Sequence, residues 1–173
     1  MKTERTLVLI KPDGLIKSLT GNIITALSET KLKIVGSKVV KVTKEFAEEH
    51  YSQLLSGLTK KFGEEKGKSI FESTLDYVQG KFHTDRVLAL VYAGENAVEK
   101  VREIAGETHP ERANPTSIRG KYGRIHSKTQ VLENVMHCSD SVENAEKEIA
   151  LWFKPGEVVD FKDRFRDKEI DTD

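Results

Sequence analysis

One histidine stands in a sequence setting that suits phosphoryl chemistry. His137 follows an apolar run that ends at Met136 and precedes the small and polar segment 138–141. Because its ordinary pKa lies near neutral pH, a neutral imidazole is a competent nucleophile toward phosphorus. Ser139 can donate a hydrogen bond to a phosphoryl oxygen, and the start of the helix predicted to follow favours anions. A lone histidine at such a place is more often structural, so its neighbours must decide between the two interpretations.

A glutamate on the following predicted helix is the first such neighbour. The helix is predicted over 140–153, with Asp140 as its N-cap and Glu143 three residues later, as in a capping box. At about 100° per residue, Glu148 falls at the edge of the apolar face. A carboxylate there can accept a proton from one ring nitrogen of His137 and leave the other nitrogen free to attack. The alternative is an ordinary glutamate at the boundary of the core.

Cationic and hydroxyl groups for phosphates occur elsewhere in the chain. Lys11 ends the first apolar run, Arg102 lies at the edge of an apolar helix face, and Thr108 and Arg119 lie in the long segment 106–128. Phosphoryl transfer depends mainly on positioning and on stabilising charge, so a lysine, two arginines and hydroxyls around one histidine are the groups it requires. Taken singly, each is typical of a solvated surface residue, and the fold must bring them together.

Two other segments imitate phosphate or nucleic-acid loops. The segment 63–69 (GEEKGKS) resembles a Walker A loop, but it has three residues between its glycines instead of four and no apolar strand before it. The segment 120–123 (GKYG) has the GxxG spacing of KH modules, but no helix is predicted before it. Neither segment therefore predicts a binding site.

The positioning elements follow from hydrophobic periodicity and turn residues. We predict strands at 6–10, 34–42, 86–93 and 132–136, and helices at 19–31, 44–58, 70–78, 95–105 and 140–153. The segment 59–69 is expected to be an exposed excursion, and 106–128 a long functional loop. This order of strands and helices predicts an α/β fold of ferredoxin-like type, an antiparallel sheet with helices packed on it.

Composition narrows the class of protein further. A chain of 173 residues with 37% hydrophobic residues suits one domain, and its 28 basic and 28 acidic residues argue against a general polyanion binder. The single cysteine excludes an internal disulfide. The longest apolar run, 87–93, is too short to cross a membrane, and we expect no signal peptide. A cytoplasmic protein with no membrane and no specific nucleic-acid partner is therefore expected.

Taken together, several segments resemble the nucleoside diphosphate kinase family. They are 4–14 (ERTLVLIKPDG), 50–51 (HY), 94–110 (GENAVEKVREIAGETHP), 117–120 (SIRG) and 134–153 (NVMHCSDSVENAEKEIALWF), within residues 4–154. The resemblance implies a ferredoxin-like α/β sandwich and homo-oligomers, either hexamers or tetramers. It also implies transfer of the γ-phosphoryl group from nucleoside triphosphates to nucleoside diphosphates by a ping-pong route through a phosphohistidine.

The resemblance also implies roles for individual residues. His137 is the phosphorylated residue, attacking through Nδ1, with Glu148 as its orienting carboxylate and Ser139 as the hydrogen-bonding neighbour. The residues that hold the phosphates, the sugar and the base-proximal end of the nucleotide are Lys11, Tyr51, Arg102, Thr108, Arg119 and Asn134. Mg²⁺ bridges the phosphates, mostly through water, with Asp140 near it. The residue that contacts the base falls at Ile70 or Phe71, and we take Phe71.

The chain departs from the family pattern at several places. Cys138 stands where the family usually has glycine, and the segment after Tyr51 is longer than usual. We also expect a kinase domain over 1–154 and a C-terminal extension over 155–173. This extension is expected to pack partly on a neighbour.

Two other functions stay open at this point. The first is a nucleotide-binding scaffold that has lost the chemistry, and the complete set of charged residues argues against it. The second is a nucleic-acid module on the same sheet topology. Such modules place exposed aromatic residues on the sheet, and the predicted strands carry few.

Overall fold

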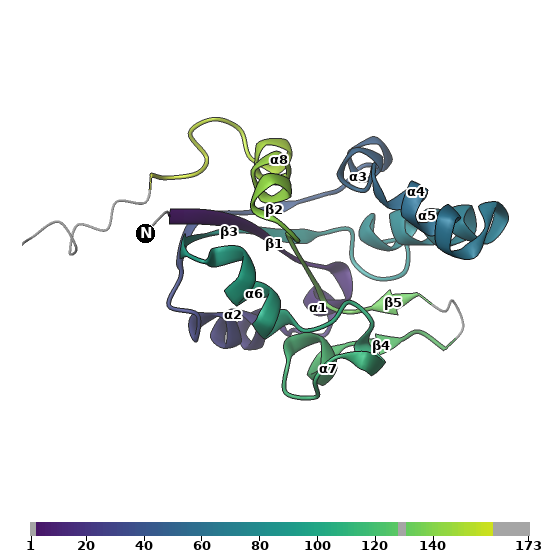
Figure 1. The fold of residues 1–173 in the computed structure, drawn as a ribbon, viewed down its shortest axis with the longest axis horizontal. Coiled ribbons are helices and arrows are strands. Elements are labelled where there is room, and N and C mark those ends of the chain that lie inside the picture. Colours follow the sequence, from purple (N-terminus) through teal and green to yellow (C-terminus); the bar gives the residue numbers. More distant parts are fainter. Residues whose placement is uncertain (1–2, 128–130, 161–173) are drawn as a thin grey trace, which may run out of the picture.

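The computed structural model describes residues 3–127 and 131–160 (Figure 1). The strands are β1 (Thr3–Ile10), β2 (Lys33–Val40), β3 (Val87–Glu95), β4 (Arg124–Ile125), β5 (Leu132–Glu133) and β6 (Met136–Cys138). The α-helices are α1 (Pro12–Ile16), α2 (Thr20–Ser28), α3 (Lys44–His50), α4 (Leu54–Phe62), α5 (Glu64–Val78), α6 (Ala97–Ala105), α7 (Ile118–Tyr122) and α8 (Val142–Trp152), and η1 (Pro110–Arg112) is a 3₁₀ turn.

Four strands form the main sheet, in the order β2-β3-β1-β6 with every neighbouring pair antiparallel. Strand β1 lies inside this sheet, paired with β3 from Thr3↔Glu95 to Ile10↔Leu88 and with β6 on its other side. This order confirms the predicted ferredoxin-like α/β fold. The short strands β4 and β5 pair in a separate antiparallel ribbon.

Helices cover both faces of the sheet, with α3 and α8 on one face and α2 and α6 on the other (Figure 1). Leu7 and Leu9 of β1 face the first layer, and Val8 and Ile10 face the second, since successive side chains of a strand point to opposite faces. All four side chains are fully buried. A strand buried on both faces needs a continuous apolar run, and this explains why β1 shows no polar alternation.

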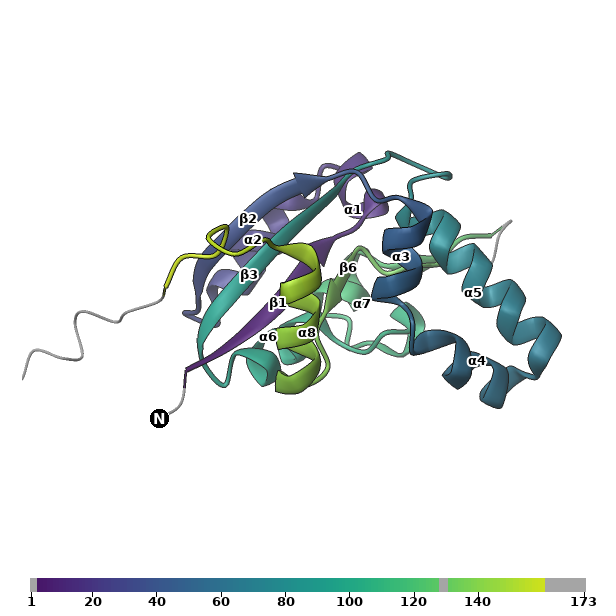
Figure 2. The ribbon, with the colours of Figure 1, turned by 90° about the horizontal axis from the view of Figure 1, so that it is seen from above.

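A helical hairpin of α4 and α5 replaces two of the predicted elements. The predicted helix 44–58 is interrupted at 51–53, and the excursion expected at 59–69 is almost entirely helical. That segment is mostly exposed, as predicted, but Gly63 makes the turn between two helices with a φ of 84°. In Figure 2 the hairpin extends away from the sheet. The prediction of irregular structure failed because the polar residues of α4 and α5 face solvent while their apolar residues pack on each other and on α3.

The predicted strand 132–136 is divided between two sheets. Glu133 ends β5 in the small ribbon, and Met136 begins β6 in the main sheet. Val135 lies between them with a φ of 59°, a conformation that is costly for a β-branched residue. Its amide donates to Asp13 Oδ2 at 2.9 Å, and its carbonyl accepts from the Lys11 amide at 2.9 Å. These contacts fix the kink that directs the chain into β6.

The chain beyond α8 runs beside β2 (Figure 2). The Val159 amide donates to the Val35 carbonyl at 2.8 Å, and Lys38 forms a 2.6 Å ion pair with Glu157. Part of the otherwise open edge of β2 is thereby paired. Within the described ranges, no helix is both long and apolar enough to span a bilayer.

Candidate active site

Strand β6 aims His137 at the layer formed by α3 and α8. His137 pairs across the strands with Leu9, so the two side chains lie on the same face of the sheet. Its Nε2 atom lies 2.9 Å from Glu148 Oε1, and the side chain is 21% exposed. The sequence predicted that His137 follows the end of a strand, but the structure places it inside β6. Because Nε2 is occupied by a carboxylate, Nδ1 is the nitrogen that carries the lone pair.

Glu148 is held by two partners. Its side chain is 17% exposed, at the edge of the buried face of α8 as predicted. The Ser139 hydroxyl donates to Glu148 Oε2 at 2.5 Å, and the Leu7 amide donates to the same hydroxyl at 3.1 Å. Burial raises the pKa of the carboxyl, but hydrogen bonds from His137 and Ser139 outweigh it, so the pKa is lowered overall. Glu148 is therefore ionised at neutral pH, with Oε1 against the imidazole of His137.

The predicted role of Ser139 as a donor to a phosphoryl oxygen is wrong in this structure. Ser139 is fully buried, and its only proton is directed to Glu148. Ser139 is still a hydrogen-bonding neighbour of the His137–Glu148 pair, but it acts on the carboxylate. The predicted N-cap is also wrong, because α8 begins at Val142 and Ser141 accepts from the Asn144 amide at 3.1 Å. Asp140 lies just outside the helix and is exposed.

The end of α3 covers the imidazole. The ring of His50 lies 4.7 Å from that of His137 in an edge-on arrangement, and the ring of Tyr51 lies 6.5 Å away. The Trp152 indole donates from Nε1 to His50 Nδ1 at 3.1 Å. Sequence reasoning assigned a role to Tyr51 but none to His50 or Trp152. The only available signal was that His50 adjoins Tyr51 in a segment that resembles the family.

Two buried cations, Lys11 and Arg119, lie near each other. Lys11 is 7% exposed, and its Nζ lies 4.5 Å from the centre of the Tyr77 ring. Burial, together with the nearby Arg119, lowers the pKa of Lys11 to about 8, while Asp13 and Glu133 oppose the change. Arg119 is also 7% exposed. Within the described part of the chain, neither cation forms a salt bridge, although Asp13 and Glu133 lie near Lys11. Burying cations without a directly paired carboxylate is costly, and it is the arrangement expected where an anion binds.

Arg119 connects the long loop to the strand of His137. Its guanidinium donates to the Gly106 carbonyl at 2.8 Å and to the Met136 carbonyl at 3.2 Å, while its Nε is buried with no partner in the described chain. Asn134 behaves similarly, since its Nδ2 donates to the Thr108 carbonyl at 2.8 Å and its Oδ1 is buried with no described partner. The predicted residues of the loop are thus tied to the β5–β6 segment.

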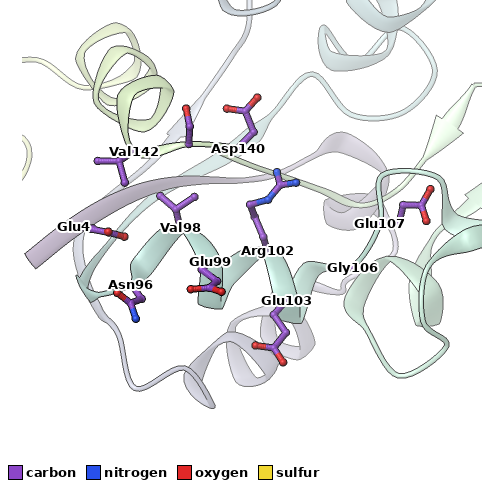
Figure 3. A pocket seen from close by; sticks show the side chains of 11 residues that line it. Glu4, Asn96, Val98, Glu99, Arg102, Glu103, Gly106, Glu107, Asp140 and Val142 are labelled. Carbon is purple, nitrogen blue, oxygen red and sulfur yellow. The ribbon is translucent and has the colours of Figure 1, made fainter.

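A cleft of about 850 Å³ opens between α6 and the connection from β6 to α8. Arg102 projects from α6 toward that connection, where Asp140 lies (Figure 3). The lining also includes the acidic residues Glu4, Glu99, Glu103 and Glu107. His137 does not line this cleft, which is shared by Arg102 and Asp140. Of the predicted binding residues, Tyr51 has its ring against the imidazole, and Lys11 lies near Arg119.

The base-contacting residue is the prediction that the structure supports least. Phe71 of α5 is 9% exposed and lies in the core cluster with Leu75 and Val78. Its ring therefore presents no open face, while the neighbouring Ile70 is half-buried. The segment 63–69, with its Walker-like spacing, lies at the turn and first residues of α5 with no strand before it, and the segment 120–123 forms the end of the short helix α7 and its C-cap. Neither forms a phosphate-binding loop.

Comparison with known proteins places this arrangement in a family. The family model described as nucleoside diphosphate kinase matches residues 4–158. A nucleoside diphosphate kinase of Pyrococcus furiosus is 42% identical over 160 residues, 92% of this chain and 89% of that protein. One from Desulfitobacterium hafniense is 40% identical over 159 residues, 92% and 93% of the two chains.

Solved structures agree. An NDP kinase from Pyrobaculum aerophilum has a TM-score of 0.79 at 31% identity and covers 92% of this chain and 100% of that one. A nucleoside diphosphate kinase from Borrelia burgdorferi, solved as a transition state mimic with vanadate and ADP, has a TM-score of 0.78 at 28% identity and covers 95% of each chain.

Proposed function

The chain belongs to the nucleoside diphosphate kinase family and transfers the γ-phosphoryl group from nucleoside triphosphates to nucleoside diphosphates, and we propose that His137 carries that group between them. One observation carries the proposal. Glu148 occupies Nε2 of a partly exposed imidazole at 2.9 Å and leaves Nδ1 as the free nucleophile. The Borrelia relative was solved as a transition state mimic with vanadate and ADP, and this supports a reaction at phosphorus.

Proton placement follows from the Glu148 contact. A neutral imidazole that donates Nε2–H to a carboxylate becomes more nucleophilic at Nδ1, because the carboxylate stabilises the positive charge that develops on the ring. Nδ1 attacks the γ-phosphorus, the bond to the leaving diphosphate oxygen breaks, and the phosphohistidine stays on the protein. The reverse sequence delivers the group to a second nucleoside diphosphate. Ser139 keeps Glu148 in place during both steps.

Charge stabilisation is assigned to the cationic residues. Lys11 and Arg119 lie close enough to each other for Arg119 to lower the pKa of Lys11, so a bound phosphate relieves the repulsion between them. Arg102 reaches the phosphates from the cleft. Tyr51, Thr108 and Asn134 bind the sugar hydroxyls and the phosphate oxygens. For the base we retain the position 70–71, where Ile70 is the more accessible of the two side chains.

We assign Mg²⁺ to the phosphates, with Asp140 as the residue that would hold it. Asp140 fits this role because it is exposed, shares the cleft with Arg102 and has one oxygen engaged by Asn144 at 2.7 Å. Mg²⁺ is usually bound by one or two carboxylates together with substrate phosphates and water. When bound, the ion neutralises charge on the phosphates. The protein's own part is to orient the phosphates with Lys11, Arg102 and Arg119.

The wider setting is proposed on the same basis. We propose a kinase domain over 1–154, a C-terminal extension over 155–173, and a cytoplasmic location, where nucleotide substrates are found. We also propose a homo-oligomer, either a hexamer or a tetramer. Apolar side chains that are exposed on β2, Ile34 at 45% and Val39 at 64%, support a subunit contact there.

A trapping experiment tests the nucleophile. Purified protein is mixed with ATP labelled at the γ-phosphorus, without acceptor, and the labelled peptide is sequenced. We expect one acid-labile, base-stable label on His137, which is released as a triphosphate when a nucleoside diphosphate is added. The comparison variant is Glu148→Gln, which should label at the same residue but more slowly. Label on any other residue contradicts the assignment.

A further inference from the structure

Helix α8 anchors two histidines, not one. Glu148 and Trp152 are four residues apart and therefore lie on one face of the helix. Glu148 contacts His137 Nε2 at 2.9 Å, and Trp152 contacts His50 Nδ1 at 3.1 Å. The two imidazole rings lie 4.7 Å apart at an interplanar angle of 78°. The same helix thus determines the proton positions of both rings.

The two anchors have opposite hydrogen-bonding character. The carboxylate of Glu148 accepts, so His137 keeps its proton at Nε2 and offers a lone pair at Nδ1. The indole of Trp152 can only donate, so His50 must accept at Nδ1 and, when neutral, keeps its proton at Nε2. Burial, together with the nearby His137, lowers the pKa of His50 to about 3, so the neutral form prevails at physiological pH.

The Nε2–H group of His50 has no acceptor. The atom is buried, and no group in the described part of the chain forms a hydrogen bond with it. A buried donor without a partner is destabilising, so native proteins rarely keep one without a use. The ring of His50 also lies beside the proposed reaction centre: it is 4.7 Å from the ring of His137, and one of its nitrogens lies within 4.8 Å of a polar atom of His137 and of Glu148.

A metal ion is the obvious alternative occupant of such a cluster. Two histidines and a glutamate form a common zinc ligand set. However, a histidine that binds a metal through one nitrogen normally donates a hydrogen bond from the other. The other nitrogen of His50 faces the Trp152 N–H group and must accept instead. The hydrogen-bonding pattern therefore favours a donor at Nε2 over a metal ligand.

We propose that His50, held in one tautomer by Trp152, donates a hydrogen bond from Nε2 to the phosphoryl group during its transfer to and from His137. The inference rests on the proposed phosphorylation of His137. A phosphoryl group on that ring brings acceptor oxygens beside the unpartnered donor, and negative charge develops there as the group moves. A fixed donor at this place stabilises the transferring group at no cost of reorganisation.

Two substitutions of His50 separate donation from packing. His50→Phe keeps an aromatic ring but removes both hydrogen-bonding nitrogens, whereas His50→Gln loses the ring but keeps an acceptor and a donor. We expect His50→Phe to lower kcat by about a hundredfold with little change in KM for nucleotides. His50→Gln should be at least about fivefold faster than His50→Phe, a partial recovery typical of a restored donor. Equal rates, or a faster Phe variant, would show that packing alone matters and would overturn the proposal.

Trp152→Phe is the matched control for the tautomer. It keeps an aromatic ring against Phe46 but removes the indole N–H group. ¹⁵N NMR of the imidazoles should show His50 protonated at Nε2 in the wild type and a mixture of tautomers in Trp152→Phe, with kcat lowered by a smaller factor than in His50→Phe. A wild-type His50 protonated at Nδ1 contradicts the proposal.

Two further readouts keep the outcomes distinct. Mapping of the phosphoryl label in each variant shows whether His137 is still the acceptor. If the wild type is not labelled at His137, the proposed function fails, whereas labelling at His137 with equal His50 variants defeats only the role of His50. Titration with Zn²⁺ addresses the other occupant: complete inhibition by one equivalent, reversed by EDTA and absent in His50→Gln, would establish a metal site and overturn the donor role.

Discussion

Two histidine–glutamate pairs in the described part of the chain have nearly the same contact distance. His137 Nε2 lies 2.9 Å from Glu148 Oε1, and His83 Nε2 lies 2.7 Å from Glu133 Oε1. The surroundings differ. Glu148 has one further partner, the neutral hydroxyl of Ser139, while Glu133 is 1% exposed and also binds Lys17 at 3.2 Å and Arg124 at 2.5 Å.

The difference shows that a histidine–glutamate contact does not by itself define a catalytic site. Glu133 is shared among Lys17, Arg124 and His83, and the cluster joins four separate segments of the chain. With only a hydroxyl on Glu148, the carboxylate charge acts mainly on His137. We propose that the Glu133 cluster stabilises the fold and that Glu148 orients a nucleophile.

Removing each imidazole should produce the largest difference between the two pairs. His137→Ala is expected to lower turnover by roughly 10⁴-fold or more, since no other group takes the phosphoryl group. His83→Ala should keep turnover within about threefold and lower stability by about 1 kcal/mol, the value of one hydrogen bond. Steady-state rates and urea unfolding measure the two effects. Substantial phosphotransfer by His137→Ala would be incompatible with the proposed site.

Neutralising each carboxylate should separate activity from stability. Glu148→Gln is expected to slow transfer by roughly a hundredfold while nucleotide affinity stays near the wild-type value, because the imidazole loses its orienting acceptor. Glu133→Gln should leave transfer nearly unchanged but cost about 2–3 kcal/mol, since three basic groups lose their shared carboxylate. Isothermal titration and unfolding curves give both quantities. A catalytic defect in Glu133→Gln larger than that in Glu148→Gln would reverse the assignment.

The smallest expected effect is on the stability of the Glu133 cluster in acid. Burial raises the pKa of Glu133, but hydrogen bonds from Arg124, Lys17 and His83 outweigh it and lower the pKa to about 2. A carboxyl with a lowered folded-state pKa contributes stability above its unfolded pKa, and this contribution is lost as the pH falls toward the folded value. Between about pH 5 and 3, the wild type should therefore lose roughly 2 kcal/mol more than Glu133→Gln. Parallel stability curves for the two proteins would show that the cluster carries no such charge.

The sequence predicted the parts of the site that lie on strongly patterned elements. Apolar periodicity predicts strand β1, which precedes Lys11, helix α6 with Arg102 and helix α8 with Glu148. The order of the elements predicts the antiparallel sheet. The hairpin of α4 and α5 was missed because a polar helix carries little apolar signal of its own. The N-cap was misplaced by one residue because Asp140 and Ser141 are equally good caps.

Non-local contacts explain what the sequence could not indicate. Nothing in the spacing of His50 and Trp152 shows that an indole will determine the tautomer of a histidine about a hundred residues away. Glu133 looks like an ordinary residue of a short strand until Lys17, His83 and Arg124 are seen around it. The cost of burying Lys11 and Arg119 appears only when the folded chain places them side by side.

The strained backbone of Val135 has a consequence for how this chain can vary. Only Asn134 and Val135 separate the ionic cluster at Glu133 from the strand that carries His137, so the kink determines how the two ends are rotated with respect to each other. Glycine would relax the backbone there, yet it would also empty a fully buried position and loosen this joint. Laboratory selection for heat resistance alone should therefore discover substitutions at position 135 that selection for phosphotransfer rejects.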